Sequence, residues 1–233
     1  MYSNLLSAAG QAAARIYGSL ALDMNTEYQG PLPTGAKILA ANHPTTTDPF
    51  IMMGLAPEPV HVLITGMCFN KPLLGRFLQG AGHIPVTAGN GPATLDKALG
   101  LLAAGKTVGI FPEGALSPLE GTHSPAHTGV ARLALASGAP VVPCGIALER
   151  EHIRFMEASD GRHTETARIY MGGAYYVTVG RPLYLTGSIG DRSYVREASG
   201  QVMAEVMRMA RTSARRMSVA RDRLGALVPA MVG

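Results

Sequence analysis

Short apolar segments alternate with helical segments along most of this chain, and that alternation restricts the fold more than any other feature. Strands are expected at 37–42, 60–65, 107–111 and 140–144, and helices are expected from Asp48 onward and at 94–102 and 129–137. Such alternation indicates an α/β fold, a largely parallel central sheet flanked by helices. Because no repeat or long linker divides it, the chain is expected to form a single domain over residues 1–233.

The regions outside this alternation carry weaker signals. A loop-rich stretch is expected from Gly75 to Gly91, around a short apolar run at 83–86. Residues 168–179 resemble strands, with a break at the Gly172-Gly173 pair. Glycine-rich segments of this kind are typical of turns and loops.

Helices are also expected at both ends of the chain. In residues 1–22, apolar side chains recur every three to four positions, which is the spacing of one face of an amphipathic helix. A basic helix is expected at 192–224, with Gly200 as a candidate break. Its apolar stripe consists of Val202, Val206, Met209, Met217 and Leu224, and arginines occupy another face.

The composition excludes a disordered chain and favours contact with apolar material. Apolar residues make up 47% of the chain and charged residues 15%, yet the mean hydropathy is only +0.15. No apolar run reaches the roughly 20 residues that a membrane-spanning helix needs. The first residues lack the basic and apolar regions of a secretory signal. Cys68 and Cys144 lie in apolar runs and are expected to be reduced packing residues, as in a cytoplasmic protein.

Positive charge is concentrated at the end of the chain. Residues 208–233 contain six arginines and one acidic residue, Asp222, whereas the preceding part has 14 basic and 15 acidic residues. Such a field attracts phospholipid headgroups, acidic carrier proteins or nucleic acid. The chain has no tryptophan and no aromatic stacking platform, so nucleic acid is not expected as a partner. The alternative is a packed helix with a solvated basic face.

The clearest candidate for catalysis is the pair His43 and Asp48, which follows the strand at 37–42. Reacting groups collect where strands end in an open α/β sheet. A histidine can take a proton from a hydroxyl near neutral pH, and a neighbouring carboxylate can fix its tautomer. The alternative is that Asp48 only caps a helix and His43 is an ordinary loop residue.

A second candidate is Phe111-Pro-Glu-Gly114, which also follows an apolar strand directly. Proline before Glu113 and glycine after it restrict where the carboxylate can lie. That carboxylate could hold a hydroxylated acceptor, and Gly114 would let a substrate approach the main chain. The alternative is an ordinary turn with a solvated acid.

Taken together, these motifs resemble those of the glycerolipid acyltransferase family, typified by 1-acylglycerol-3-phosphate acyltransferases. The resemblance rests on Asn42-His-(four residues)-Asp48, on Phe111-Pro-Glu-Gly114 and on Val142-Pro143, in this order. It extends from Ile38 to Pro182 and includes Gly180-Arg-Pro182 near its end.

This resemblance implies a fold of the glycerolipid-acyltransferase type and a role for each matching residue. His43 would act as general base on the acceptor hydroxyl and Asp48 would orient it. Glu113 and Gly114 would hold the acceptor, and Pro143 would help to shape the acyl pocket. The donor would be an acyl thioester of coenzyme A or acyl carrier protein, with a lipid acceptor, no metal and no bound cofactor. The protein would be cytoplasmic and peripheral on the inner face of the membrane.

The chain departs from the family pattern at two cationic positions. Alanine occupies position 88, where phosphate-accepting members have arginine, and Ala115-Leu116-Ser117 stands where Thr-Arg-Ser is common. An arginine fork is well suited to holding a phosphate. Lys71 and Arg76 lie upstream as candidate substitutes. The acceptor is therefore either lysophosphatidate-like or a hydroxyl or amine on a neutral or differently charged lipid.

The same residues leave alternative functions open. Water or a phospholipid as the partner would make the protein a thioesterase or transacylase, and loss of chemistry would leave a lipid- or carrier-binding protein. His123 and His127 are separated by Pro125 and do not predict a metal site, because zinc needs three or four converging ligands. His61 and His83 are expected to be buried structural residues.

Overall fold

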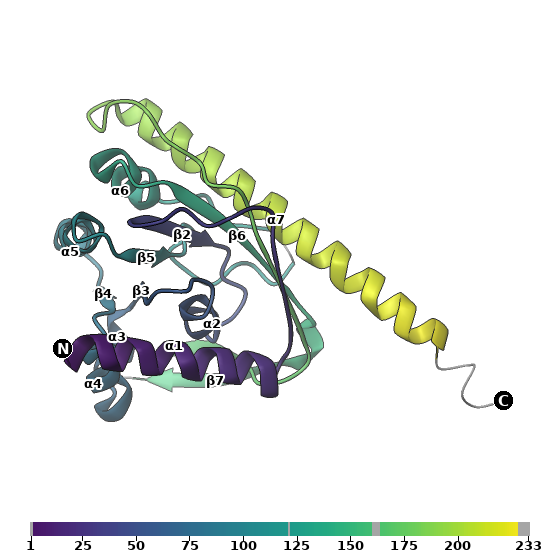
Figure 1. Cartoon of the computed structure of the whole chain (residues 1–233). Helices are drawn as coiled ribbons and strands as arrows, with labels where there is room; N and C mark the ends of the chain where they lie inside the picture. Colours follow the sequence, from purple (N-terminus) through teal and green to yellow (C-terminus); the bar gives the residue numbers. More distant parts are fainter. Residues whose placement is uncertain (1, 121, 160–163, 228–233) are drawn as a thin grey trace.

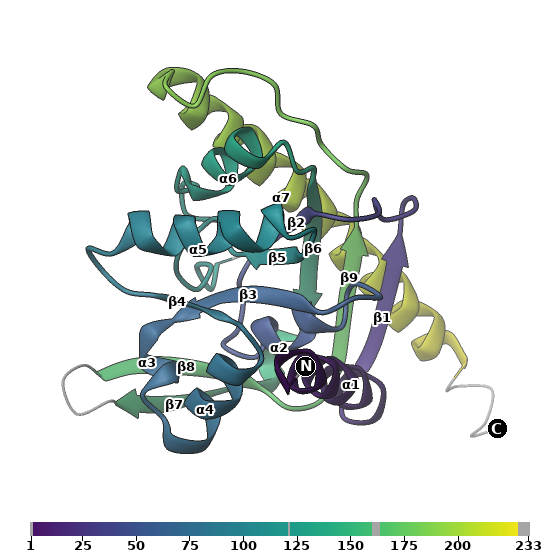
Figure 2. The same ribbon diagram turned by 60° about the vertical axis from the view of Figure 1, so that its left-hand side comes forward.

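A computed structural model describes residues 2–120, 122–159 and 164–227. One sheet is built from β1 (Asp23–Tyr28), β2 (Lys37–Ala41), β3 (Val60–Thr65), β4 (Ile84–Val86), β5 (Thr107–Ile110), β6 (Val141–Leu148) and β9 (Ala174–Val179). Its strand order is β1-β9-β6-β2-β5-β3-β4 (Figures 1 and 2). Neighbours from β6 to β4 pair in parallel, whereas β9 is antiparallel to β6 and parallel to β1. The largely parallel α/β sheet expected from the sequence is confirmed.

Helices cover both faces of this sheet. They are α1 (Tyr2–Leu20), α2 (Asp48–Met53), α3 (Gly66–Phe69), α4 (Pro72–Gly80), α5 (Gly91–Ala103), α6 (Gly129–Ser137) and α7 (Arg192–Leu227). Helices α5, α6 and α7 pack on one face, and α1 and α2 lie on the other (Figures 1 and 2). Within the described ranges, no helix is both long enough and apolar enough to cross a membrane.

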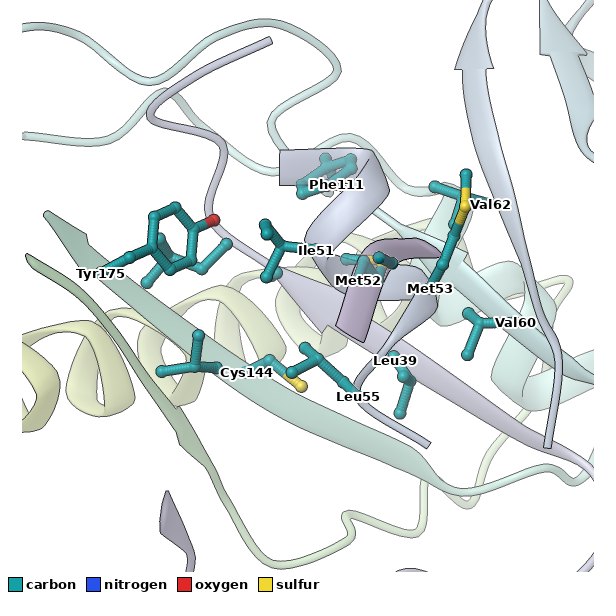
Figure 3. Close-up of a cluster of buried hydrophobic side chains, with 14 of the residues drawn as sticks. Leu39, Ile51, Met52, Met53, Leu55, Val60, Val62, Phe111, Cys144 and Tyr175 are labelled. Atoms are coloured by element: carbon teal, nitrogen blue, oxygen red, sulfur yellow. The ribbon is translucent and has the colours of Figure 1, made fainter. Parts of the chain in front are cut away.

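The core follows from the alternation of side chains along β2, whose residues are all buried. Leu39 belongs to the cluster on the α1 and α2 side, and Ile38 belongs to the cluster under α5, α6 and α7. Figure 3 shows part of the first cluster, to which Leu39 of β2 and Ile51 and Met52 of α2 belong. A strand buried on both faces is expected at the centre of a parallel sheet.

Helix α7 lies unusually close to β6 at Gly145. A Cβ at this position would lie 1.9 Å from the backbone nitrogen of Ala210 and 2.0 Å from the backbone carbon of Met209. Only glycine therefore allows this approach, which the Ser213 hydroxyl fixes by donating to the Gly145 carbonyl over 2.8 Å. The helix also continues through Gly200, so the candidate break is wrong. A glycine costs a helix only about 1 kcal/mol, and packing of the buried residues around it outweighs that cost.

The prediction of loops between Gly75 and Gly91 is also wrong in part. Residues 66–80 form α3 and α4, with Pro72 in the first turn of α4, where proline is well tolerated. Gly75 serves close packing rather than a turn, because a Cβ there would lie 2.0 Å from the Phe69 carbonyl oxygen. A separate antiparallel pair, β7 (Ile153–Ser159) and β8 (Thr164–Tyr170), lies outside the main sheet.

Candidate active site

The carboxyl ends of β2 and β5 bring the two sequence motifs together. These strands pair in parallel, so the segments that follow them leave the sheet at the same edge. The His43 ring stacks on Phe111, with 4.0 Å between ring centroids and 16° between ring planes. The histidine motif and the Phe111-Pro-Glu-Gly114 motif therefore form one site.

His43 is paired with Asp48 across the start of α2. The imidazole Nδ1 lies 3.0 Å from Asp48 Oδ2. An ionised carboxylate only accepts hydrogen bonds, so Nδ1 carries the proton and donates it. The other ring nitrogen, Nε2, is then the basic one. The His43 side chain is 16% exposed, which leaves it within reach of a substrate.

Asp48 is held by further donors in a fully buried position. Its Oδ2 accepts from the Thr45 amide over 2.7 Å, and its Oδ1 accepts from the Thr45 hydroxyl over 2.5 Å and from the Tyr175 hydroxyl over 2.8 Å. With the His43 contact this makes four hydrogen bonds, which is the full capacity of a carboxylate. Burial, followed by the Asp48 charge, raises the pKa of Tyr175 well above its ordinary value. The phenol therefore stays protonated and donates.

Asn42 fastens the chain just before His43 to the neighbouring strand. Its side-chain Nδ2 donates to the Ile146 carbonyl over 3.0 Å, and its Oδ1 accepts from the Ile146 amide over 2.7 Å. The amide side chain thus continues the ladder between β2 and β6 past the last paired residue of β2. The backbone of His43 leaves the sheet at a fixed point.

Glu113 is buried, with 1% of its surface exposed. Its Oε1 accepts from the Ser117 hydroxyl over 2.5 Å and from the His43 amide over 3.3 Å, and its Oε2 accepts from the Ser124 amide over 2.9 Å. Ser117 in turn donates its amide to the His43 carbonyl over 2.7 Å. These bonds make Glu113 a positioning residue for the backbone around His43. A direct role in holding the acceptor stays a prediction.

Gly114 follows with a backbone that favours glycine. Its φ is +66°, in the left-handed region, and a Cβ would lie 2.7 Å from Cδ2 of His127. Both observations explain the glycine without a substrate, so the predicted approach of a substrate to its main chain stays untested.

The remaining predicted site residues lie apart from this network. Lys71 donates through Nζ to the Ser159 carbonyl, and Arg76 is exposed on α4. Neither forms a hydrogen bond or ion pair with His43 or Asp48 in the described part of the chain. Pro143 is buried within β6, where its carbonyl accepts from the amide of Gly180 over 2.8 Å. Its role in an acyl pocket also stays a prediction.

Arg168 is a site residue that the sequence does not reveal. It lies on β8, and its guanidinium donates to the Ser117 carbonyl over 2.5 Å. It also lines a cavity of about 380 Å³ beside the His43 segment. Tyr175 is likewise missed, because it is 127 residues from Asp48 and only the position of β9 brings it there.

Two histidines expected to be structural are indeed buried. His83 accepts through Nδ1 from the Val62 amide over 3.1 Å, and burial lowers its pKa to about 4. Burial also lowers the pKa of His61, whose Nδ1 lies 3.1 Å from the Gly82 carbonyl oxygen. Among the described residues, no three His, Cys, Asp or Glu side chains gather in a way that would hold a metal ion.

The fold and site define an α/β protein with a carboxylate-oriented histidine at the carboxyl edge of its sheet. A family model named Acyltransferase matches residues 24–147, which is more than half of the chain. The chain therefore belongs to the Acyltransferase family.

Among solved structures, the chain is similar to the 1-acyl-sn-glycerophosphate (LPA) acyltransferase PlsC from Thermotoga maritima. The two are 20% identical, with a TM-score of 0.57, and the match covers 88% of this chain and 79% of that one. The likeness shows a shared fold. A comparison with curated proteins gave no match.

Proposed function

We propose that this protein transfers an acyl group from an acyl thioester to a hydroxyl of a lipid, with His43 as general base. One observation carries the proposal. Nδ1 of His43 is fixed on a buried carboxylate that has all four of its hydrogen bonds, which leaves Nε2 as a base at a site open to substrate. Membership of the Acyltransferase family supports acyl transfer as the reaction.

The reaction balances with the residues of this site alone. Nε2 of His43 takes the proton of the acceptor hydroxyl while the oxygen attacks the thioester carbonyl carbon. The carbon–sulfur bond then breaks, and His43 returns the proton to the departing thiolate. Asp48 stabilises the imidazolium between these two steps. General-base assistance of this kind contributes about 10²- to 10⁴-fold in rate.

The donor and acceptor are part of the same proposal. We take the donor to be an acyl thioester of coenzyme A or acyl carrier protein, as co-substrate without a bound cofactor. The acceptor is a lipid with a free hydroxyl, and the name of the similar PlsC structure supports a glycerophosphate lipid. Ala88 and Leu116 supply no cation for such a phosphate, so it needs another partner in this chain.

A lipid acceptor implies work at a membrane surface, and we propose peripheral attachment through α1 on the cytoplasmic face. One face of α1 is fastened to the domain, where Gln11 donates to the Ala56 carbonyl over 2.6 Å. Outward-facing Leu5, Ile16 and Leu20 are exposed, Leu20 to 83%. Apolar side chains presented in this way can enter the headgroup region of a bilayer.

Sedimentation with anionic phospholipid vesicles tests this attachment. Leu20→Glu should lower the bound fraction, because it places a charge where an apolar side chain would enter the bilayer. Ile189→Glu removes an exposed apolar residue outside α1 and should leave binding unchanged. Equal binding of both variants and the native protein would contradict attachment through α1.

Release of free thiol from acyl-coenzyme A, with and without acceptor lipids, tests the reaction. The native protein should release thiol only with an acceptor, and His43→Ala should abolish release. His152→Ala is a control, since this histidine is exposed and lies outside the site. Release without acceptor would indicate a thioesterase. No release from acyl-coenzyme A or from acyl carrier protein would leave only a binding function.

A further inference from the structure

A cavity of about 380 Å³ lies between α7 and the carboxyl end of β6. Six residues of α7 line it, at a spacing of one to four positions that marks one side of the helix: Met207, Ala210, Arg211, Ala214, Met217 and Arg221. The small side chains of Ala210 and Ala214 leave room beside the strand. The cavity lies beside the close approach of α7 to β6, since Ala210, which would meet a Cβ at Gly145, also lines it.

The cavity adjoins the catalytic histidine. Asn42 and Pro44, the residues on either side of His43, both line it. Ser117 lines it too, and its amide donates to the His43 carbonyl over 2.7 Å. His43 itself does not line the cavity, but the residue before it, the residue after it and a hydrogen-bond partner of its main chain all do.

Arginines from both sides of the cavity give it a positive character. Arg150 comes from the turn after β6 and Arg168 from β8, and Arg211 and Arg221 come from α7. Arg150 and Arg168 each donate one hydrogen bond to a backbone carbonyl, which orients the guanidinium and leaves further N–H donors.

The two arginines of α7 that line the cavity form no such hydrogen bond. The guanidinium groups of Arg211 and Arg221 form no hydrogen bond or ion pair with any described residue. By contrast, the nearby Arg208 pairs with Glu205 over 2.8 Å, and Arg216 pairs with Glu27 over 3.1 Å. Of the six arginines near the end of the chain, those that line the cavity are therefore available to a ligand.

Two acidic side chains also line the cavity, and they do not cancel its charge. The Glu149 carboxylate is engaged by His152 over 3.5 Å and accepts from the Ala174 amide over 3.2 Å. Glu151 is exposed on the turn at Arg150–His152. Four guanidinium groups against two carboxylates leave a net positive site.

We propose that this cavity binds a phosphate ester of a substrate, with Arg168 and Arg211 as the principal contacts. Guanidinium groups match the geometry of phosphate oxygens, and four of them disfavour an acyl chain. Two substrates of the proposed reaction carry such a group, namely a phospholipid acceptor and a coenzyme A or carrier-protein donor. The identity of these molecules rests on the proposed function, whereas the preference for a phosphate rests on the arginines that line the cavity.

Calorimetric titration without turnover tests the site. The probes are lysophosphatidate against monoacylglycerol, both below their aggregation limits, and coenzyme A against pantetheine. One phosphorylated probe should bind the native protein at least tenfold more tightly than its phosphate-free counterpart. Arg211→Gln should remove roughly tenfold or more of that affinity, as expected for hydrogen bonds to a charged group. Arg215→Gln removes an exposed arginine that does not line the cavity and should bind as the native protein does.

The outcome identifies the source of the phosphate. If Arg211→Gln loses affinity for lysophosphatidate alone, the cavity holds the acceptor phosphate. If it loses affinity for coenzyme A alone, the cavity holds the donor phosphate. Equal binding of phosphorylated and phosphate-free probes, or an unchanged affinity in both Arg211→Gln and Arg168→Gln, would overturn the inference. Because Arg168 also holds Ser117, its variant is compared with the native protein in thermal unfolding. Phosphate-dependent binding without acyl transfer would defeat the proposed reaction alone.

Discussion

Two histidines beside the parallel strands have opposite surroundings. His43 follows β2, keeps 16% of its side chain exposed and lies 3.0 Å from the Asp48 carboxylate. His83 precedes β4 and is 7% exposed, and its Nδ1 accepts from the backbone amide of Val62. Its Nε2 is buried with no hydrogen-bond partner among the described residues. The same side chain is thus placed once beside a fixed negative charge and once beside a neutral amide.

The difference explains why only one of them is suited to proton transfer. In the proposed reaction, the carboxylate would stabilise the imidazolium that forms when His43 takes a proton, and the exposed edge of the His43 ring would let a hydroxyl approach. His83 gains no such partner, and burial lowers its pKa to about 4, so it stays neutral at ordinary pH. The surroundings rather than the residue type therefore distinguish the proposed general base from a packing residue.

Removing the charge beside His43 should have the largest effect. Asp48→Asn replaces one accepting oxygen by an amide donor, which cannot accept the Nδ1 proton or stabilise an imidazolium. We expect kcat to fall by about 10²- to 10⁴-fold. The measurement is acceptor-dependent thiol release at saturating substrate.

Two comparisons make that result interpretable. Asp96→Asn changes an exposed aspartate on α5 and should keep native kcat. Thermal unfolding of Asp48→Asn shows whether the fold survives the loss of one acceptor. A folded Asp48→Asn protein with native kcat would contradict the role of the carboxylate.

The buried histidine predicts how stability depends on pH. The ordinary pKa is 6.5 and the folded-state pKa is about 4, so between these values the unfolded chain binds the proton that the folded chain refuses. The free energy of unfolding therefore falls as pH drops from 6.5 to 4, by about 3 kcal/mol from this group. His61, whose pKa burial also lowers, adds to the same trend.

Chemical denaturation across this pH range checks the prediction. His83→Asn should unfold with a visibly weaker dependence on pH than the native protein, whatever its absolute stability. His152→Asn, an exposed replacement, should keep the native dependence. Parallel curves for the native protein and His83→Asn would show that His83 does not remain neutral.

The sequence predicts those parts of the fold in which apolar pattern and burial coincide. The strand expected at 107–111 is β5, and the helix expected at 129–137 is α6, because both lie in the core. The polar strand β1 is not predicted from the sequence. As an edge strand it exposes most of its side chains, so its sequence has little apolar pattern. Helix α4 is not predicted either, because glycines such as Gly75 are typical of loops. Here the close approach of the Phe69 main chain requires that glycine.

The candidate site also has a part that the sequence predicts and a part that it does not. His43 and Asp48 are only five residues apart, on the segment that leads from β2 into α2, so their contact could be predicted from spacing and chemistry. Tyr175 and Arg168 reach the site only through the positions of β9 and β8, which no local pattern encodes. The departures at Ala88 and Leu116 show that cations are missing. They do not show that Arg168 lies against Ser117, next to Leu116.

Asn42 tests whether the His43 segment depends on its anchorage to β6. Asn42→Ala removes both side-chain hydrogen bonds to Ile146 and leaves a buried amide and carbonyl without them. We expect a loss of about 1–3 kcal/mol in the free energy of unfolding, together with a lower kcat. Asn90→Ala changes an exposed asparagine that makes no side-chain cap and should stay within about 0.5 kcal/mol of the native protein. Native stability and kcat in Asn42→Ala would show that the anchorage is dispensable.

The smallest expected effect isolates one hydrogen bond to Asp48. Tyr175→Phe keeps the ring in the core and removes only the hydroxyl that donates to Oδ1 over 2.8 Å. The carboxylate then keeps three of its four donors, so we expect a loss of about 1 kcal/mol in stability and a several-fold decrease in kcat. The neighbouring Tyr176→Phe is a matched control, because its hydroxyl has no hydrogen bond among the described residues and its ring still faces Arg216. If the Tyr175 hydroxyl only fills space, both variants will behave alike. If it holds Asp48 for His43, only Tyr175→Phe will slow acyl transfer, and its KM for both substrates will stay native.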